Sequence, residues 1–374
     1  MSLIIVLSKI ALFVNQCKGK GHLITYAYRL TVQAVIHLVF ECCASIRNKN
    51  KRHTMMQWFK AKTFLGSILF AGLLLQSAAA NAFCWWWQDC TAYKTKHPIV
   101  LVHGLSGFDS ILGIDYFYGV KGELEERGAT VYIPNVTSWE DGYVRGEQLL
   151  AYLEELKAIT GANKFNLIGH SLGAPTSRYV AGVRPDLVAS VTSVNGANSG
   201  SGFADAARGI VPVGGGTEAL IEGALNLLGN IIDALSGNPD YSQDALGAVT
   251  FLTTPGANAF NDMFPAGRPT SWCGEGASKV NGVRYYSWGG DWIATNVLDI
   301  SDPFLLFTGA TMLGQQSDGL VGQCQQNWGD VISTDYNLNH LDGVNLLFGL
   351  SNLFEVDPVV LFENHARRLK SAGL

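Results

Sequence analysis

Basic residues are scarce in this chain. Only 26 of its 374 residues are lysine or arginine, against 31 aspartates and glutamates, which gives a formal net charge of −5. Proteins that bind nucleic acid usually carry a basic surface, so this balance disfavours that function. Charged residues of both signs make up only 15% of the chain, whereas 48% of the residues are hydrophobic and 11% aromatic. This composition disfavours disorder and is typical of a globular α/β enzyme with a large core.

The chain also has no long apolar run near its N-terminus. The apolar run Phe64–Leu75 is too short to span a membrane, and it follows a basic start and precedes Ala-Asn-Ala at 80–82, a small-x-small cleavage pattern. These features predict a secretory signal peptide over residues 55–82. Residues 1–54 precede it and are predicted to be an over-extended leader, with true initiation at Met55 or Met56. The alternative is a native N-terminal extension or a membrane anchor.

Cysteine is sparse as well. Of seven cysteines, cleavage after Ala82 would leave four, an even number that fits disulfides in an exported protein: Cys84, Cys90, Cys273 and Cys324. Residues 1–82 hold ten of the 26 basic residues and one of the 31 acidic residues, so the remainder has a formal charge near −14. Such a surface disfavours electrostatic docking on anionic membranes and leaves hydrophobic contact with lipid open.

The motif Gly169-His170-Ser171-Leu172-Gly173 follows an apolar, strand-like run and precedes a helix-compatible segment, residues 174–183. This is the G-x-S-x-G nucleophile elbow in its expected context of strand, tight turn and helix. The two glycines let the strand and the helix pass close together, and the turn holds the Ser171 hydroxyl at a helix N-terminus. We predict that Ser171 is the nucleophile. The alternative is a glycine-bounded turn with a capping serine.

A glycine-rich loop follows the predicted strand within residues 97–108. In hydrolases built around an elbow, one oxyanion donor comes from this loop and the other from the residue after the nucleophile. The backbone N–H groups of Leu105 and Leu172 are therefore predicted to form the oxyanion hole. His103 precedes the serine, against the Ser, acid, His order of this fold, so we expect it to order the loop by hydrogen bonding.

Strand-like and helical segments alternate along the chain. Strands are predicted within residues 97–108 and at 130–133, 165–169 and 187–194, and helical spacing of leucines covers 146–159. This alternation predicts a mostly parallel central sheet flanked by helices. Together with the elbow motif, it predicts an α/β-hydrolase type of fold. No internal repeat or long linker interrupts it, so we expect one catalytic domain over residues 92–374. Residues 83–91 form a Cys/Trp-rich segment, in which Cys84 and Cys90 could close a loop.

Between about residues 200 and 240 the character of the sequence changes. Glycine-rich stretches flank Thr217–Leu235, an amphipathic and unusually apolar helical segment. It is either an ordinary buried helix or a lid that covers an apolar cleft in water and opens at an oil surface. The residues alone do not choose between these two interpretations.

The chain order of the elbow fold restricts the catalytic base to His340 or His365. His365 lies in a predicted terminal helix, 358–370, beside three basic residues, and is predicted to be on a solvated face. His340 lies in a polar loop before a predicted apolar helix, 344–350, and is the better candidate. Asp318, in the glycine turn Ser317–Gly322, is the predicted acid; it could instead be a plain turn residue. Asp330 and Asp335 do not lie in such a glycine turn and are less favoured as the acid. The resulting Ser171, Asp318, His340 set predicts acyl transfer.

Several stretches together resemble the Pseudomonas- and Burkholderia-type secreted triacylglycerol lipases. They cover nearly all of residues 92–374 and comprise HPIVLVHGLSGFD (97–109), VRGEQLL (144–150), NLIGHSLG (166–173), RYVAGVRPDL (178–187), CGEGA (273–277), SDGLVG (317–322) and NHLDGVN (339–345). The resemblance implies the same triad and favours the lid interpretation. It also implies a Cys273–Cys324 disulfide, which would tie the loop of the acid to the body of the protein.

The resemblance further implies a structural Ca²⁺ site formed by the carboxylates of Asp299 and Asp342 and the backbone carbonyl of Leu350. The alternative is that Asp299 and Asp342 merely cap turns. The family has a glutamine at the position of Leu346; here the backbone carbonyl of Leu346 or a water would replace it. A membrane-anchored foldase and type II secretion through the periplasm to the extracellular medium are implied as well.

The sequence therefore predicts a secreted triacylglycerol lipase that hydrolyses long-chain acylglycerols at a lipid–water interface. An esterase or polyester depolymerase with the same triad is the main alternative. A non-catalytic lipid-binding protein is a third hypothesis, disfavoured by the intact set of Ser171, Asp318 and His340.

Overall fold

The computed structural model describes residues 89–105, 110–111, 114–209, 244–299, 301–312, 314–346 and 348–374, all within the compact unit Asn81–Leu374. The predicted leader, the signal peptide, Cys84 and the predicted lid helix Thr217–Leu235 lie outside these residues. Cys90 is disulfide-bonded. None of the helices in the described part is long and apolar enough to cross a bilayer.

In the described residues, seven strands form one sheet. Its order is β4 (Val131–Tyr132), β1 (Ile99–Val102), β5 (Phe165–His170), β6 (Val188–Val194) and β8 (Val283–Gly290), and β8 also pairs with β7 (Lys279–Val280) and β9 (Asp330–Tyr336). Every pairing is parallel except that of β7 with β8. A separate hairpin joins β2 (Ser110–Ile111) to β3 (Ile114–Asp115). The predicted parallel sheet is confirmed.

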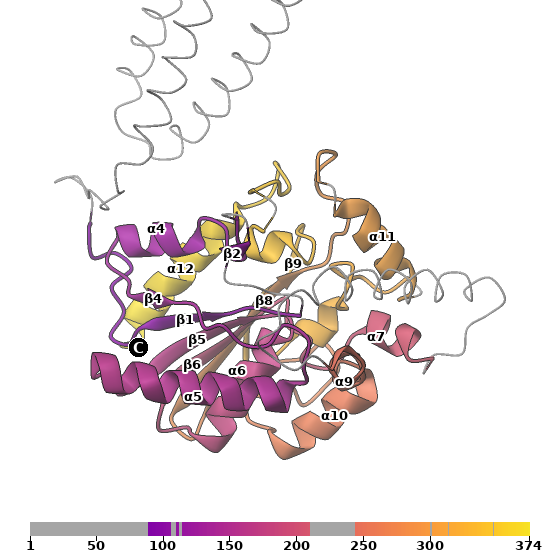
Figure 1. The fold of residues 1–374 in the computed structure, drawn as a ribbon. Coiled ribbons are helices and arrows are strands. Elements are labelled where there is room, and N and C mark those ends of the chain that lie inside the picture. The colour runs from indigo at the N-terminus through magenta and orange to yellow at the C-terminus, as the bar shows by residue number, and fades with distance from the viewer. Residues whose placement is uncertain are drawn as a thin grey trace, which may run out of the picture. The chain divides into compact units, whose positions relative to one another are not determined.

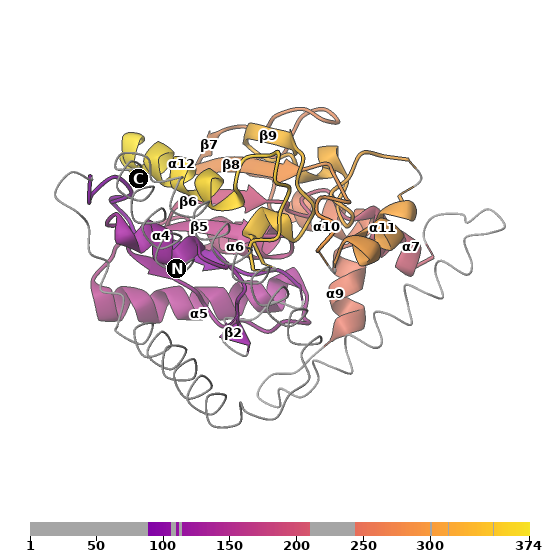
Figure 2. The same cartoon turned by 90° about the horizontal axis from the view of Figure 1, so that it is seen from above.

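Helices cover both faces of this sheet (Figures 1 and 2). On one face α4 (Val120–Glu126) and α12 (Pro358–Ser371) pack on alternate strand residues such as Leu101 and Ile168. On the other, α5 (Gly142–Thr160) and α6 (Gly173–Val183) pack on the residues between them, such as Val102 and Leu167. Successive strand residues point to opposite faces, so two covered faces bury β1, β5 and β6 at every position.

Local signals explain where the helices begin and end. The carboxylate of Asp141 accepts the backbone N–H groups of Tyr143 and Val144 at the start of α5, and Gly161 ends this helix with φ 71°. Asp357 caps α12, whose first residue is Pro358. The remaining helices of the described residues are α7 (Gly202–Ala207), α9 (Ala245–Phe251), α10 (Thr254–Met263), α11 (Asp302–Ala310) and the 3₁₀ turns η1 (Gln323–Gln326) and η2 (Asp342–Val344).

Two local predictions were wrong. The helix predicted over 344–350 is absent from its described residues: only η2 forms, because Asn345 (φ 59°), Phe348 (φ 54°) and Gly349 (φ 72°) adopt left-handed backbone that no α-helix accepts. His365 is not on a solvated face. It is fully buried against the rings of Trp288 and Tyr286, because α12 turns its apolar side to the sheet and its basic residues to solvent.

Candidate active site

Ser171 lies at the carboxyl end of β5, where the chain turns sharply into α6. Its backbone φ is 55°, in the left-handed region that a non-glycine residue adopts only at a cost of about 1–3 kcal/mol, and its N–H donates to the carbonyl of Val194 at 3.0 Å. A Cβ on Gly169 would collide with the carbonyl of Gly173, and a Cβ on Gly173 with that of Val102. The predicted close approach of strand and helix is therefore confirmed, and only glycine fits at both positions.

The loop after β1 lies directly against this turn. A Cβ built on Gly104 would come within 2.7 Å of the Cβ of Ser171, so Leu105, the next residue, lies near the nucleophile candidate. Leu172 is fully buried at the N-terminus of α6, and its N–H has no protein acceptor among the described residues. Both predicted oxyanion donors are thus backbone amides on segments that flank Ser171.

His103 orders the loop, as predicted. Its Nδ1–H donates to the carbonyl of Gly104 at 3.0 Å, while Arg145 of α5 donates to the carbonyl of His103. The side chain is fully buried, and burial together with the neighbouring guanidinium lowers the pKa of His103 to about 3. His103 therefore stays neutral under all ordinary conditions.

Asp318 and His340 meet in a buried contact. His340 Nδ1 lies 2.8 Å from Asp318 Oδ2, and the two residues are 3% and 0% exposed. The backbone N–H of His340 also donates to the carbonyl of Asp318 at 2.8 Å. Asp318 Oδ1 accepts the N–H groups of Leu320 at 3.0 Å and Val321 at 2.8 Å. Asp318 therefore orients the imidazole of His340, and the backbone of the Asp318 turn fixes the Asp318 carboxylate in place. Asp330 and Asp335, the less favoured acids, are exposed on β9.

The loop of His340 is joined to the elbow through His170. His170 Nε2–H donates to the carbonyl of His340 at 2.9 Å, and the two imidazole rings lie 4.8 Å apart. His170 Nδ1 accepts a hydrogen bond from the hydroxyl of Tyr116 at 2.6 Å, and that hydroxyl accepts one from the N–H of Gly104 at 3.1 Å. In the described part of the chain Ser171 and His340 share no hydrogen bond, and in unliganded enzymes such a bond often tightens only with substrate.

Two contributors to this site were missed by the sequence reasoning. Besides His170, which the elbow motif contains without revealing its role, Asn195 contacts the acid: its Nδ2 donates to Asp318 Oδ2 at 2.9 Å. Asn195 directly follows β6, so the only signal available was a polar residue at the carboxyl end of a strand next to the elbow strand.

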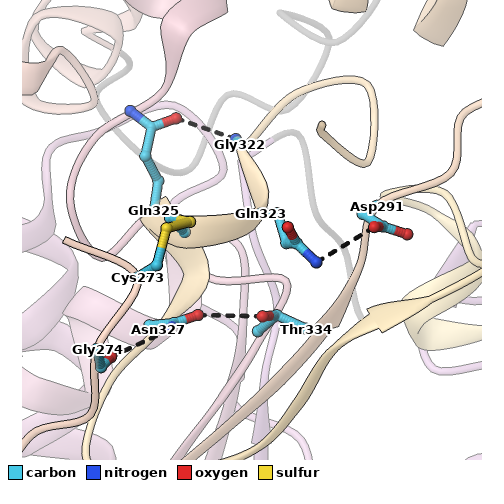
Figure 3. The surroundings of a disulfide bond; sticks show 9 residues. Cys273, Gly274, Asp291, Gly322, Gln323, Gln325, Asn327 and Thr334 are labelled. Atoms are coloured by element: carbon cyan, nitrogen blue, oxygen red, sulfur yellow. Dashed lines mark hydrogen bonds between the residues drawn. A yellow bond between two sulfur atoms is a disulfide. The ribbon is translucent and has the colours of Figure 1, made fainter. Parts of the chain in front are cut away.

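The Cys273–Cys324 disulfide is present as predicted, and its environment is shown in Figure 3. Cys324 lies in η1, six residues after Asp318, and the loop around it is further held by a hydrogen bond from Gln323 to Asp291 and by one from Gly322 N–H to Gln325. The bridge therefore fixes the segment that follows the acid to the loop before β7.

The predicted calcium ligands lie next to the His340 loop. Asp299 and Asp342 are 4% and 3% exposed, and neither forms an ion pair with a lysine or arginine in the described residues. Burial, then the nearby Asp299 and Asp302 carboxylates, raises the pKa of Asp342 to about 7. Asn296 Nδ2 donates to the carbonyl of Ser351, which brings the residue after Leu350 to the loop before Asp299. Two buried carboxylates that accept hydrogen bonds but have no lysine or arginine partner in the described residues are a donor set that suits a hard cation.

This donor set holds only two carboxylates. Within the described ranges no group of three His, Cys, Asp or Glu side chains is arranged to hold a metal. The Leu346 side chain packs against the apolar core beside α4 and α12, so only its backbone carbonyl could take part.

Comparison with known proteins agrees with the fold. The α/β hydrolase fold family matches residues 97–321. A triacylglycerol lipase of Vibrio cholerae is 52% identical over 281 residues, covering 75% of this chain and 90% of the relative. Triacylglycerol lipases of Pseudomonas fragi (42% identity; 75% of this chain and 98% of the relative) and Burkholderia plantarii (41% identity; 76% and 88%) are also similar.

Among solved structures, a metagenomic carboxyl esterase shares the fold at 19% identity, with a TM-score of 0.50 over 74% of this chain and 76% of that one. The Vibrio, Pseudomonas and Burkholderia relatives have enough identity and coverage to assign the family as well as the fold. The chain belongs to the triacylglycerol lipases of the α/β-hydrolase fold, and it is a carboxylic ester hydrolase of the serine hydrolase class.

Proposed function

We propose that Ser171, His340 and Asp318 are the catalytic triad of this lipase. The observation that carries this proposal is the buried contact between His340 and Asp318. A hydrogen bond from His170 joins the loop of His340 to the strained turn that bears Ser171. The order of the three residues along the chain is that of the elbow hydrolases. His365, the competing base, is enclosed in the core under α12 and has no access to substrate.

In the first half of the reaction, His340 Nε2 takes the proton of Ser171 as the serine Oγ attacks the ester carbonyl carbon. Asp318 fixes the tautomer in which Nδ1 carries the proton and Nε2 is free. The backbone N–H groups of Leu105 and Leu172 then stabilise the negative oxygen of the tetrahedral intermediate. When that intermediate collapses, the ester C–O bond breaks and the leaving alcohol takes the proton from His340.

In the second half, water attacks the acyl-enzyme and gives its proton to His340. The second tetrahedral intermediate uses the same two amides, and its collapse returns the proton to Ser171 and releases the carboxylic acid. Both amides are fixed by folded segments, so little reorganisation is needed when charge develops.

Long-chain acylglycerols at a lipid–water interface are the proposed substrates. The names of the relatives support acylglycerols, and exposed apolar side chains support hydrophobic contact with lipid: Val297, Leu298, Phe348, Leu353 and Phe354. They lie on the loops around the candidate calcium site. Their exposure favours an insoluble lipid substrate over the small soluble esters that an esterase would hydrolyse.

Ca²⁺ is the proposed structural ion, held by Asp299, Asp342 and the carbonyl of Leu350. Bound there, it would neutralise two buried carboxylates and fix the loop that carries His340, because Asp342 stands only two residues after the base. Asn339, directly before the base, already ties this loop together: its side-chain Nδ2 donates to Asp302 at 3.0 Å, and its side-chain Oδ1 accepts the N–H of Asp342 at 2.8 Å.

Export through the periplasm, with a signal peptide at 55–82, is the proposed route to the extracellular medium. The Cys273–Cys324 disulfide supports an oxidising destination. A foldase and the type II secretion machinery remain the proposed partners, on the strength of the sequence resemblance.

Hydrolysis of an emulsified long-chain triacylglycerol, measured beside a soluble short-chain ester, tests the substrate. We expect turnover of the emulsion, reduced by a calcium chelator and lost in Ser171→Ala. Turnover of the soluble ester alone would contradict the lipase substrate and favour an esterase, and retained function in Ser171→Ala would favour a binding protein.

A further inference from the structure

Asn195 occupies an unusual place in the site. It follows β6 directly, its backbone φ is 45°, and it is 1% exposed. Its Nδ2 donates to Asp318 Oδ2 at 2.9 Å, and the same oxygen is 2.8 Å from His340 Nδ1. The other carboxylate oxygen accepts two backbone N–H groups. Four donors therefore surround the Asp318 carboxylate, and Asn195 supplies the only side-chain donor other than His340 in the described residues.

The orientation of the Asn195 amide follows from its surroundings. Its Oδ1 is buried without a hydrogen-bond partner among the described residues and packs against Gly343, where a Cβ would collide with it. Turning the amide over would bring Oδ1 against the carboxylate of Asp318 and lose the bond to Oδ2. Left-handed backbone favours glycine or asparagine at this position, but it does not require a side-chain amide. The unpartnered carbonyl oxygen opposes stability. The contact that the amide adds is the donation to Asp318.

We propose that Asn195 is a positioning residue that fixes the Asp318 carboxylate so that Oδ2 faces the His340 imidazole. Without this amide, His340 itself is the only side-chain donor left at Oδ2 among the described residues, and the carboxylate can rotate about its side-chain bond away from the ring. Contact of the same amide with Gly343 also sets the distance between β6 and the His340 loop. The inference rests on the proposed triad, in which Asp318 acts through His340.

The first test is Asn195→Gly, since glycine keeps the left-handed backbone and removes the amide. With a soluble short-chain ester, we expect kcat to fall between about 10-fold and 100-fold with little change in KM, as for a misplaced catalytic group. Asn281→Gly is the matched control, because Asn281 also adopts a left-handed backbone (φ 50°) but is exposed in the turn between β7 and β8. It should retain wild-type kcat.

Asn195→Asp is the second variant, because aspartate keeps the size of the side chain but, when ionised, donates nothing and faces Asp318 with like charge. Its kcat should fall at least as far as that of the glycine variant. Thermal unfolding of each variant separates loss of folding from loss of positioning. A folded Asn195→Gly or Asn195→Asp enzyme with kcat within twofold of wild type would overturn the proposal.

A double-mutant cycle with Asp318→Asn separates positioning from general structural damage. If Asn195 acts through Asp318, then adding Asn195→Gly to Asp318→Asn should lower kcat less than twofold further. Equal loss in both backgrounds would assign Asn195 a structural role and overturn the inference. Wild-type activity in Asp318→Asn alone would instead overturn the proposed triad, so the two failures are distinguishable.

Discussion

The buried histidine of the terminal helix predicts a pH dependence of stability that can be isolated with a single substitution. His365 Nε2 lies 2.8 Å from Thr192 Oγ1, and Arg368 donates to its Nδ1 at 3.0 Å. Complete burial, then the Arg368 guanidinium, holds the pKa of His365 well below 6.5. The folded protein therefore keeps this ring neutral in the pH range in which the unfolded chain protonates it.

The sign and size follow from proton linkage. Below pH 6.5 the unfolded state binds a proton that the folded state excludes, so this group's contribution to stability falls with falling pH, by up to about 1.4 kcal/mol per pH unit. The loss continues as the pH falls for as long as the folded state excludes the proton. Against a total of about 5–15 kcal/mol for a typical protein, a slope of this size is readily measured.

The perturbation is His365→Gln, whose amide can still donate to Thr192 but does not titrate. At pH 7 we expect the variant to be less stable by about 1–2 kcal/mol, because ring packing on Trp288 and Tyr286 is lost. Urea unfolding measured at intervals from pH 7 to 4.5 should show this deficit shrinking as the pH falls. A deficit that stays constant over the range would refute the reasoning, since it would mean that the folded state also protonates His365.

Three further predictions address the site. Gly104→Ala places a Cβ 2.7 Å from that of Ser171 and should lower kcat by at least about 100-fold, whereas Gly122→Ala in α4, where no neighbour lies within 4 Å, should not; equal kcat in both variants would contradict the loop geometry. Cys273→Ser with Cys324→Ser opens a link across 51 residues and should lower the unfolding free energy by about 4 kcal/mol in denaturant titrations, and an unchanged midpoint would be contrary evidence. Asp342→Asn should abolish any rise in Tm on adding Ca²⁺ to chelator-treated protein; a wild-type rise in this variant would place the ion elsewhere.

The sequence was most informative where chemistry depends on local chain geometry. The glycines around Ser171 predicted the tight turn, and the chain order of an elbow fold led to Asp318 and His340, which the structure brings into contact. Periodicity likewise predicted the helix that became α5, with bounds wider by a few residues because Asp141 and Gly161 cap it.

The sequence was least informative where a residue's environment is set by distant parts of the chain. Three basic neighbours suggested a solvated His365, although buried residues of α12, among them Leu361, Phe362, His365 and Leu369, recur at the spacing of one helical face. The 344–350 segment is apolar, but left-handed residues within it prevent a helix. Asn195 lies 123 residues before Asp318, and their contact arises only when β6 and the Asp318 loop fold together.

Covalent labelling of the nucleophile tests the central claim most directly. A soluble alkyl phosphonate ester should react once per molecule, and mass spectrometry of the digested protein should place the label on the peptide that contains Ser171. Ser171→Ala should take up no label, and His340→Ala should react far more slowly while remaining folded. A label on another residue, or esterase activity that survives in Ser171→Ala, would contradict the assignment of Ser171, His340 and Asp318 as the catalytic triad.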